Sequence, residues 1–138
     1  MPPKAKRFKI RYNWMRFMYA YIIVGAGSLG LGFLVAPNTV LNLLGYPSQE
    51  PIWAGVGYSV MLAFAILSIL GLRAPLKFSP VLLMSLTYKV IWFIAIFIPM
   101  LLAGQLPSYA IPTGMIFATY IIGNLIAIPF GYLLAGGQ

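Results

Sequence analysis

The sequence predicts an all-α integral membrane protein, a four-helix bundle of up-and-down topology with both ends of the chain in the cytoplasm. The hydrophobic fraction is 62% and the charged fraction is 7%, whereas charged residues make up about a quarter of a typical soluble domain. The mean hydropathy is +0.94. Long apolar segments alternate with short loops, and only every second loop is basic, which is the pattern of a multi-pass membrane protein.

The first segment, residues 1–13, is expected to be a basic cytoplasmic arm in front of a single membrane domain, residues 14–138. Six of the nine Lys and Arg residues lie among the first sixteen positions. In a soluble protein this charge would suggest nucleic acid, but basic residues directly before an apolar segment are typical of the inner flank of a membrane helix. We therefore expect no nucleic-acid binding. The candidate contacts to lipid or to a partner subunit are Lys4, Lys6, Arg7, Lys9 and Arg11.

Four apolar segments follow, each long enough to cross about 30 Å of hydrocarbon at about 1.5 Å per residue. Pro99 and Pro129 are expected to bend the last two helices. The loops are short, so consecutive helices should be antiparallel neighbours. The predicted spans are about 17–36, 52–72, 80–103 and 110–134.

The loop charges predict the orientation of these spans. Residues 1–16 and the 73–77 loop together hold eight basic residues, whereas the 37–51 and 104–109 loops hold none. Basic loops stay in the cytoplasm, so both chain ends are expected there. The chain is expected to be a multi-pass protein of a bacterial inner (plasma) membrane.

Rows of small residues mark three of the four spans. Such rows let helix backbones approach closely in lipid, where no hydrophobic effect drives helices together. They are expected to pack helices within the bundle, or to face another subunit. The candidate packing residues are Ala26, Ser28, Gly30 and Gly32 in the first span, Gly55, Ser59 and Ala63 in the second, and Thr119, Gly123, Ala127 and Gly131 in the fourth.

Lys89 is the one charged residue deep inside a predicted span. It lies about 13 Å past the start of the third helix at Pro80, and a cation at that depth costs a few kcal/mol. Counting from the 104–109 turn places Asn124 at the same depth on the next helix. We expect an intramembrane polar cluster of Lys89, Asn124, Ser85, Tyr88, Trp92 and Tyr120.

Three interpretations of Lys89 stay open at this point. It is a structural lysine that is satisfied locally. Alternatively, it pairs with an acidic residue or a lipid head group of a neighbouring molecule. The third interpretation is that it binds a translocated anion or ligand, or changes its protonation during transport.

Catalysis and cofactor ligation find little support in the composition. The chain has no Cys and no His, which excludes thiolate nucleophiles, His-ligated haem and the usual zinc sites. No phosphate loop, dinucleotide fingerprint or nucleophile elbow is present. We therefore expect no enzyme activity and no cofactor held by side-chain ligands, with bound lipid as the ligand that the composition leaves open.

The first half of the chain resembles the DoxX-like group of small four-helix bacterial membrane proteins. The resemblance rests on Gly-Leu-Gly-Phe-Leu-Val-Ala-Pro at residues 30–37, on Leu-Asn-Leu-Leu-Gly at residues 41–45, and on the Gly- and Ala-rich second helix that follows. Some members of that group are named as subunits of quinone-linked oxidoreductases. The resemblance therefore implies an accessory subunit.

Together these features predict a non-catalytic accessory or structural subunit of a larger membrane protein complex, of respiratory, photosynthetic or transport type. Its expected partners are membrane lipids and other membrane subunits. The alternative is a homo-oligomeric channel, carrier or lipophile-binding protein that uses Lys89 and Asn124.

Overall fold

The computed structural model describes residues 8–135 and confirms the all-α class. Within this range, four helical segments are long and apolar enough to cross a membrane. The chain is thus a multi-pass membrane protein built as a four-helix bundle. The arm residues Lys4, Lys6 and Arg7 lie outside the described range.

The first membrane segment is continuous but not uniform. It comprises α1 (Tyr12–Ile22), a π-helical turn η2 (Ile23–Gly27) and α2 (Ser28–Val35). It begins five residues before the predicted position 17, because nothing between Tyr12 and Arg16 prevents helix formation and the exposed Arg16 lies close to the helix end. The helix stops where Pro37 restricts the residue that precedes it.

A short surface helix, α3 (Pro37–Leu44), connects the first two spans. Proline suits its first position, where the missing N–H would have no helical partner. Gly45 ends it with a φ of 77°, a left-handed conformation that favours glycine.

The second span, α4 (Pro51–Arg73), is capped at its N-terminus by the side chain of Glu50. The Glu50 carboxylate accepts the backbone N–H groups of Ile52 and Trp53, both at 2.8 Å. These bonds satisfy two of the donors that every helix leaves open at its N-terminus.

Proline affects the last two spans in different ways. The third span runs through α5 (Ser79–Trp92), η3 (Phe93–Phe97) and α6 (Ile98–Leu102). Its π turn directly precedes the helical turn that holds Pro99, so the span stays helical, as is common where a π-bulge adjusts the hydrogen bonding.

The fourth span differs from the predicted 110–134. Its main helix, α7 (Ala110–Ala127), ends before Pro129, and a single turn, α8 (Phe130–Leu133), follows. Ile128 is extended, with φ −68° and ψ 127°, because the proline ring disfavours a helical conformation at the preceding residue.

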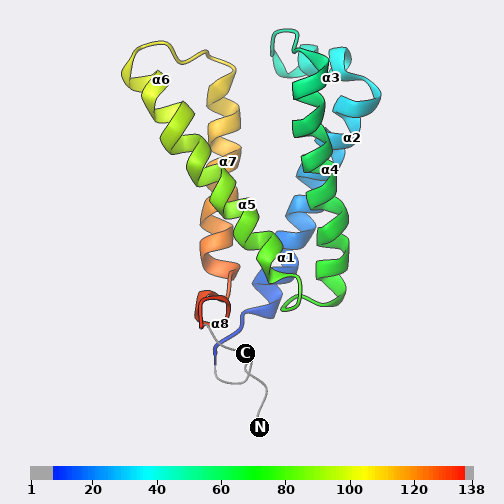
Figure 1. The fold of residues 1–138 in the computed structure, drawn as a ribbon, viewed down its shortest axis with the longest axis vertical. Helices are drawn as coiled ribbons and strands as arrows, with labels where there is room; N and C mark the ends of the chain where they lie inside the picture. The colour runs from blue at the N-terminus through cyan, green and yellow to red at the C-terminus, as the bar shows by residue number, and fades with distance from the viewer. Residues whose placement is uncertain (1–7, 136–138) are drawn as a thin grey trace.

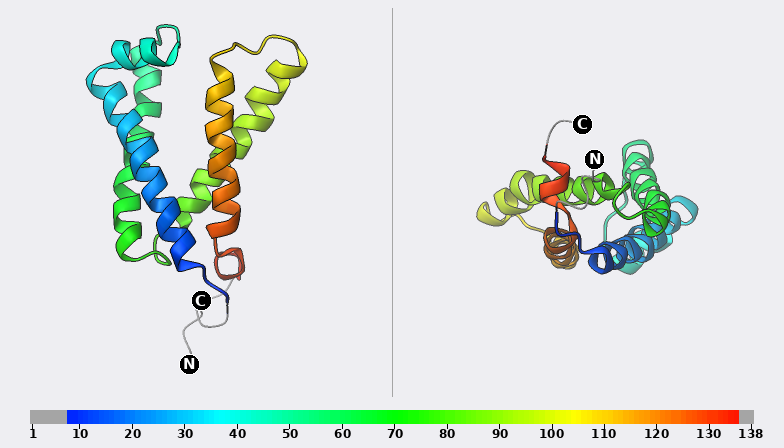
Figure 2. Two further views of the ribbon diagram at one scale, coloured as in Figure 1. Left: turned by 180° about the vertical axis from the view of Figure 1, so that it is seen from behind. Right: turned by 90° about the horizontal axis from the view of Figure 1, so that it is seen from below.

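The helices form two pairs that meet at one end of the molecule. α1, η2 and α2 pack along α4, while α5 packs along α7. Figures 1 and 2 show the two pairs close together near α8 and diverging towards α3. The end near α8 carries the described basic loop residues and is called the basic end below. The other is called the opposite end.

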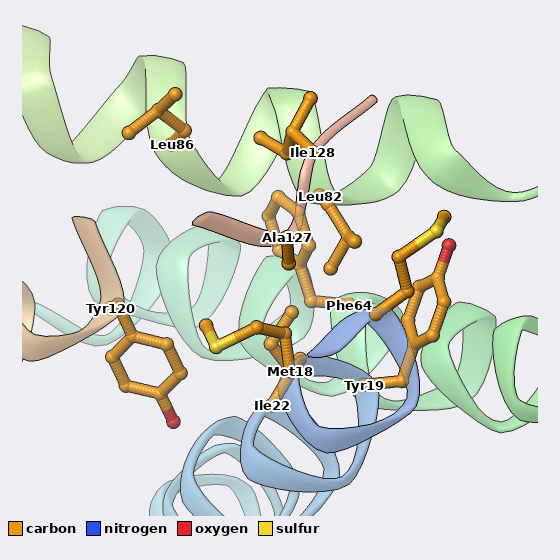
Figure 3. Close-up of a cluster of buried hydrophobic side chains, with 10 residues drawn as sticks. Met18, Tyr19, Ile22, Phe64, Leu82, Leu86, Tyr120, Ala127 and Ile128 are labelled. Carbon is orange, nitrogen blue, oxygen red and sulfur yellow. The ribbon is translucent and has the colours of Figure 1, made fainter. Parts of the chain in front are cut away.

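The hydrophobic core lies where α1, α4, α5 and α7 meet, in the half of the bundle nearer the basic end. Figure 3 shows side chains of this core. Met15, Met18, Tyr19 and Leu82 have no exposed surface. At the opposite end the pairs are linked through Tyr46, whose hydroxyl hydrogen-bonds the Thr113 hydroxyl. The bundle is therefore tightly packed at one end and more open at the other.

Candidate functional site

Lys89 lies in the last turn of α5 and is almost completely enclosed, with 4% of its surface exposed. The only acidic side chain of the chain, Glu50, caps α4 at the opposite end. The ammonium group must therefore be stabilised by neutral groups of this bundle, or by a molecule from outside it.

Neutral groups of the bundle surround the ammonium closely. Lys89 Nζ donates to the Ser85 hydroxyl at 2.8 Å and to the Tyr88 hydroxyl at 2.9 Å. A longer contact of 3.5 Å reaches the Ser85 carbonyl. Oxygen acceptors thus lie within reach of the three ammonium protons.

Three aromatic rings complete the surroundings of the ammonium. The centroids of Tyr88, Tyr120 and Phe117 lie 4.2, 4.6 and 5.3 Å from Lys89 Nζ. A desolvated cation–π contact contributes up to about 2 kcal/mol, and insertion scales put the cost of a central lysine at about 2.5–3.5 kcal/mol. The rings and hydroxyls of the bundle therefore offset part of that cost without an external anion.

Asn124 meets Lys89 at a shared partner, the Ser85 hydroxyl. The Asn124 amide nitrogen donates to Ser85 Oγ at 3.4 Å, from the neighbouring helix α7. The amide oxygen is completely buried and has no hydrogen-bond partner in the described part of the chain. An unpaired buried acceptor is costly, so this oxygen is the one unsatisfied group beside the ammonium.

Trp92 lies farther from the ammonium than the sequence led us to expect. Its ring packs on Phe117 at 5.0 Å and on Phe97 at 5.4 Å, behind the rings that face Lys89. Phe117 takes the expected place. The sequence feature that could have identified Phe117 is its position seven residues before Asn124, two turns away on the same face of α7.

Tyr120 joins the cluster to the first span. Its ring stacks on Tyr21 with centroids 3.9 Å apart, and its hydroxyl donates to the Tyr21 carbonyl at 2.9 Å. The close approach needs Gly25, because a side chain at that position would collide with the Tyr120 hydroxyl. The polar cluster thus connects α5 and α7 to α1 and η2.

Some of the small residues serve packing inside the bundle. Gly30 is buried against α4, where an added Cβ would stand 2.9 Å from the Leu62 nitrogen. Gly123 is buried against Met18, Ala26 packs against the core, and Ala127 is 1% exposed.

The other members of the rows in the first and fourth spans lie nearer the surface. Ser28 donates to the carbonyls of Val24 and Gly25. The Thr119 hydroxyl hydrogen-bonds that of Tyr21 at 2.6 Å. A Cβ added at Gly32 would meet Val40, and one at Gly131 would meet Phe8.

The row on α4 lies nearer the surface, where Ser59 and Ala63 are exposed and Gly55 is partly exposed. Gly55, Ser59 and Ala63 line an open surface groove of about 580 Å³. A Cβ added at Gly55 would meet no atom within 4 Å. The other residues that line the groove are apolar: Leu34, Ile52, Val56 and Val60.

Two of the five predicted docking residues of the arm belong to the described chain. Lys9 and Arg11 are both exposed, and the Arg11 guanidinium donates to the Ile126 carbonyl at 2.9 Å. The arm therefore contacts the end of α7.

Comparison with protein-family models, with curated proteins and with solved structures finds no match to this chain. The resemblance to the DoxX-like group stays a prediction from the sequence. A function is therefore argued from the bundle itself.

Proposed function

We propose that this chain is a non-catalytic accessory subunit of a larger membrane protein complex, and that it receives a transmembrane helix of a partner subunit in the groove on α4. The observation that carries the proposal is the open row Gly55, Ser59 and Ala63. The complex would be respiratory, photosynthetic or transport-related, in a bacterial inner membrane.

The chemistry of the groove suits a helix as its occupant. In lipid, helices associate through close packing, and small residues at spacing four allow the backbones to approach. The bundle already uses such an approach at Gly30, against the backbone of α4. The row that starts at Gly55 offers the same kind of surface on the outer side of α4.

The surroundings of Lys89 support an apolar docking surface rather than an ionic one. The ammonium is enclosed by hydroxyls and aromatic rings of the chain itself. A partner would then need no carboxylate to pair with Lys89. Lys89 makes its contacts within the bundle, and α4 contacts the partner.

Bulky substitutions in the groove test this proposal. Mild detergent extraction followed by native mass spectrometry should recover the wild-type chain with a second membrane protein. Gly55→Leu and Ser59→Leu should release that partner. Gly57→Leu is the matched control, because Gly57 lies outside the groove and also has open space around it.

The result that contradicts the proposal is equally direct. A wild-type chain that is extracted only as a monomer or only with copies of itself has no partner subunit. Equal loss of the partner in Gly55→Leu and Gly57→Leu would show that the groove is not the docking site.

One observation favours a second candidate, a homo-oligomeric channel, carrier or lipophile-binding protein. The Asn124 oxygen, which has no partner in the described chain, lies beside the Lys89 cluster. The helix pairs diverge towards the opposite end (Figure 1). A small polar lipophile could use that oxygen as an acceptor. This candidate would be supported over the first if a bound molecule is detected, is lost in the Asn124→Leu variant and is retained in the Ser28→Ala variant.

A further inference from the structure

A pocket of about 310 Å³ opens at the basic end, between the arm and the end of α7. Its lining combines cations, aromatic rings and backbone. Lys9 and Arg11 come from the arm, and Leu125, Ile126 and the segment around Pro129 come from the fourth span. No part of the proposed docking groove on α4 contributes to it.

The break at Pro129 leaves the backbone carbonyls of Leu125, Ile126 and Ala127 without their helical donors. Proline has no N–H, so the Leu125 carbonyl lacks the donor four residues later. The Phe130 N–H donates to the Ile128 carbonyl at 3.0 Å. The Ile126 carbonyl, four residues before Phe130, therefore lacks this donor. The Ile128 N–H is already committed to the Asn124 carbonyl at 2.8 Å.

Arg11 caps one of these three carbonyls. Its Nη1 donates to Ile126 at 2.9 Å, an interaction typical of a cation at a helix C-terminus. No group in residues 8–135 donates to the Leu125 carbonyl. The residues that line the pocket therefore include Leu125, whose carbonyl has no donor in the described chain.

The same pocket offers N–H donors that no acceptor in the described part of the chain engages. A guanidinium carries five N–H groups and an ammonium three, and Arg11 makes a single bond in the described chain while Lys9 makes none. Among residues 8–135, the only carboxylate is that of Glu50 at the opposite end. Within residues 8–135, positive charge without an ion-pair partner therefore lies beside a carbonyl without a donor.

We propose that this pocket binds the head group of an anionic phospholipid that also carries hydroxyls, of the phosphatidylglycerol type. The phosphate lies against Lys9 and Arg11, and a head-group hydroxyl donates to the Leu125 carbonyl. The edge-to-face pair Phe8 and Tyr132, with centroids 6.3 Å apart, forms an aromatic wall of the kind that is common at membrane interfaces.

Lipid titration with a matched pair of variants tests the site. The delipidated full chain is titrated in native mass spectrometry with phosphatidylglycerol, phosphatidic acid, phosphatidylcholine and soluble glycerol phosphate. Lys9→Gln should weaken phosphatidylglycerol binding about fivefold, the usual contribution of one basic residue near a membrane surface. Lys77→Gln removes an exposed basic residue from the loop that follows α4, away from the pocket, and should change nothing.

The expected order of affinity is phosphatidylglycerol, then phosphatidic acid, then phosphatidylcholine. Equal weakening by Lys9→Gln and Lys77→Gln would show only a diffuse surface charge and would overturn the site. Phosphatidic acid binding as well as phosphatidylglycerol would overturn the role of the Leu125 carbonyl. Glycerol phosphate binding as tightly as the lipid would overturn the lipid as its ligand.

Discussion

At the scale of single residues, the buried amide of Asn124 is only partly hydrogen-bonded within the described chain. One amide atom donates to Ser85, and the other is buried without a partner. A leucine has the same branched arrangement of side-chain heavy atoms and no polar atom, so Asn124→Leu should raise the free energy of unfolding by about 1 kcal/mol. Denaturant titration in detergent micelles measures this change.

The matched control at this position is Asn124→Ala, which removes the same amide but leaves a void. It should be less stable than Asn124→Leu by about 2–3 kcal/mol. A leucine variant that is as unstable as the alanine variant would mean that the Asn124 oxygen is satisfied by a bound molecule.

Glu50 links stability to pH at the opposite end. The N–H groups of Trp53 and Ile52 stabilise the carboxylate and lower its pKa below the ordinary 4.5. The folded chain therefore binds this proton less readily than the unfolded chain. The stabilisation is complete above the ordinary pKa and is lost as the pH falls through the lower folded value.

This dependence should appear as a fall in melting temperature below pH 4.5 in wild-type protein. Glu50→Gln keeps one acceptor for the helix but does not titrate, so its melting temperature should be flatter over the same range. A carboxyl titration, followed by NMR, that places the pKa of Glu50 at or above its ordinary value would refute the capping role.

At the scale of helical elements, the contact between α2 and α4 depends on Gly30. A Cβ at this position would stand 2.9 Å from the Leu62 nitrogen and 3.1 Å from the Tyr58 carbonyl oxygen. Backbone atoms yield less readily than a flexible side chain. Gly30→Ala should therefore lower the free energy of unfolding by about 1–3 kcal/mol.

Gly57→Ala is the control for this prediction, because its added methyl group meets nothing within 4 Å. Alanine is favoured over glycine inside a helix by about 1 kcal/mol, so this variant should be as stable as wild type or more so. Denaturant titration of both variants checks the pair. Similar losses in the two would contradict close packing at Gly30.

At the scale of the whole molecule, the described basic loops and the opposite loops lie at different ends of the bundle (Figure 1). The positive-inside rule then predicts that the basic end is cytoplasmic. Reporter fusions near Ser48 and Gln105 should report the outer compartment, and fusions after Arg73 or Gln138 should report the cytoplasm. A cytoplasmic signal at Gln105 would contradict the four-span orientation.

The divergence of the two helix pairs is also a property of the whole molecule. Packing at the basic end is continuous from α1 to α4, α5 and α7. At the opposite end, Tyr46 provides the contact, with its hydroxyl bonded to Thr113 and its ring 4.7 Å from Tyr109. The two helix pairs are therefore packed together along α1 at the basic end and contact each other through Tyr46 at the opposite end.

The sequence by itself determined the fold class and the number of spans. Hydrocarbon thickness sets a helix length, and lipid requires that each backbone group bond within its own helix. These constraints act on composition along the chain, so a linear reading detects them. Counting from the turns also placed Lys89 and Asn124 at one depth, because helical rise is constant.

Only the tertiary structure decided which side chains meet and which faces stay open. Phe117 rather than Trp92 faces Lys89, and Gly30 is buried while Gly55 is open. In lipid, every face of every helix is apolar, so hydrophobic periodicity does not distinguish an inner face from an outer one. Rotation of each helix about its axis is fixed instead by the fit between individual side chains.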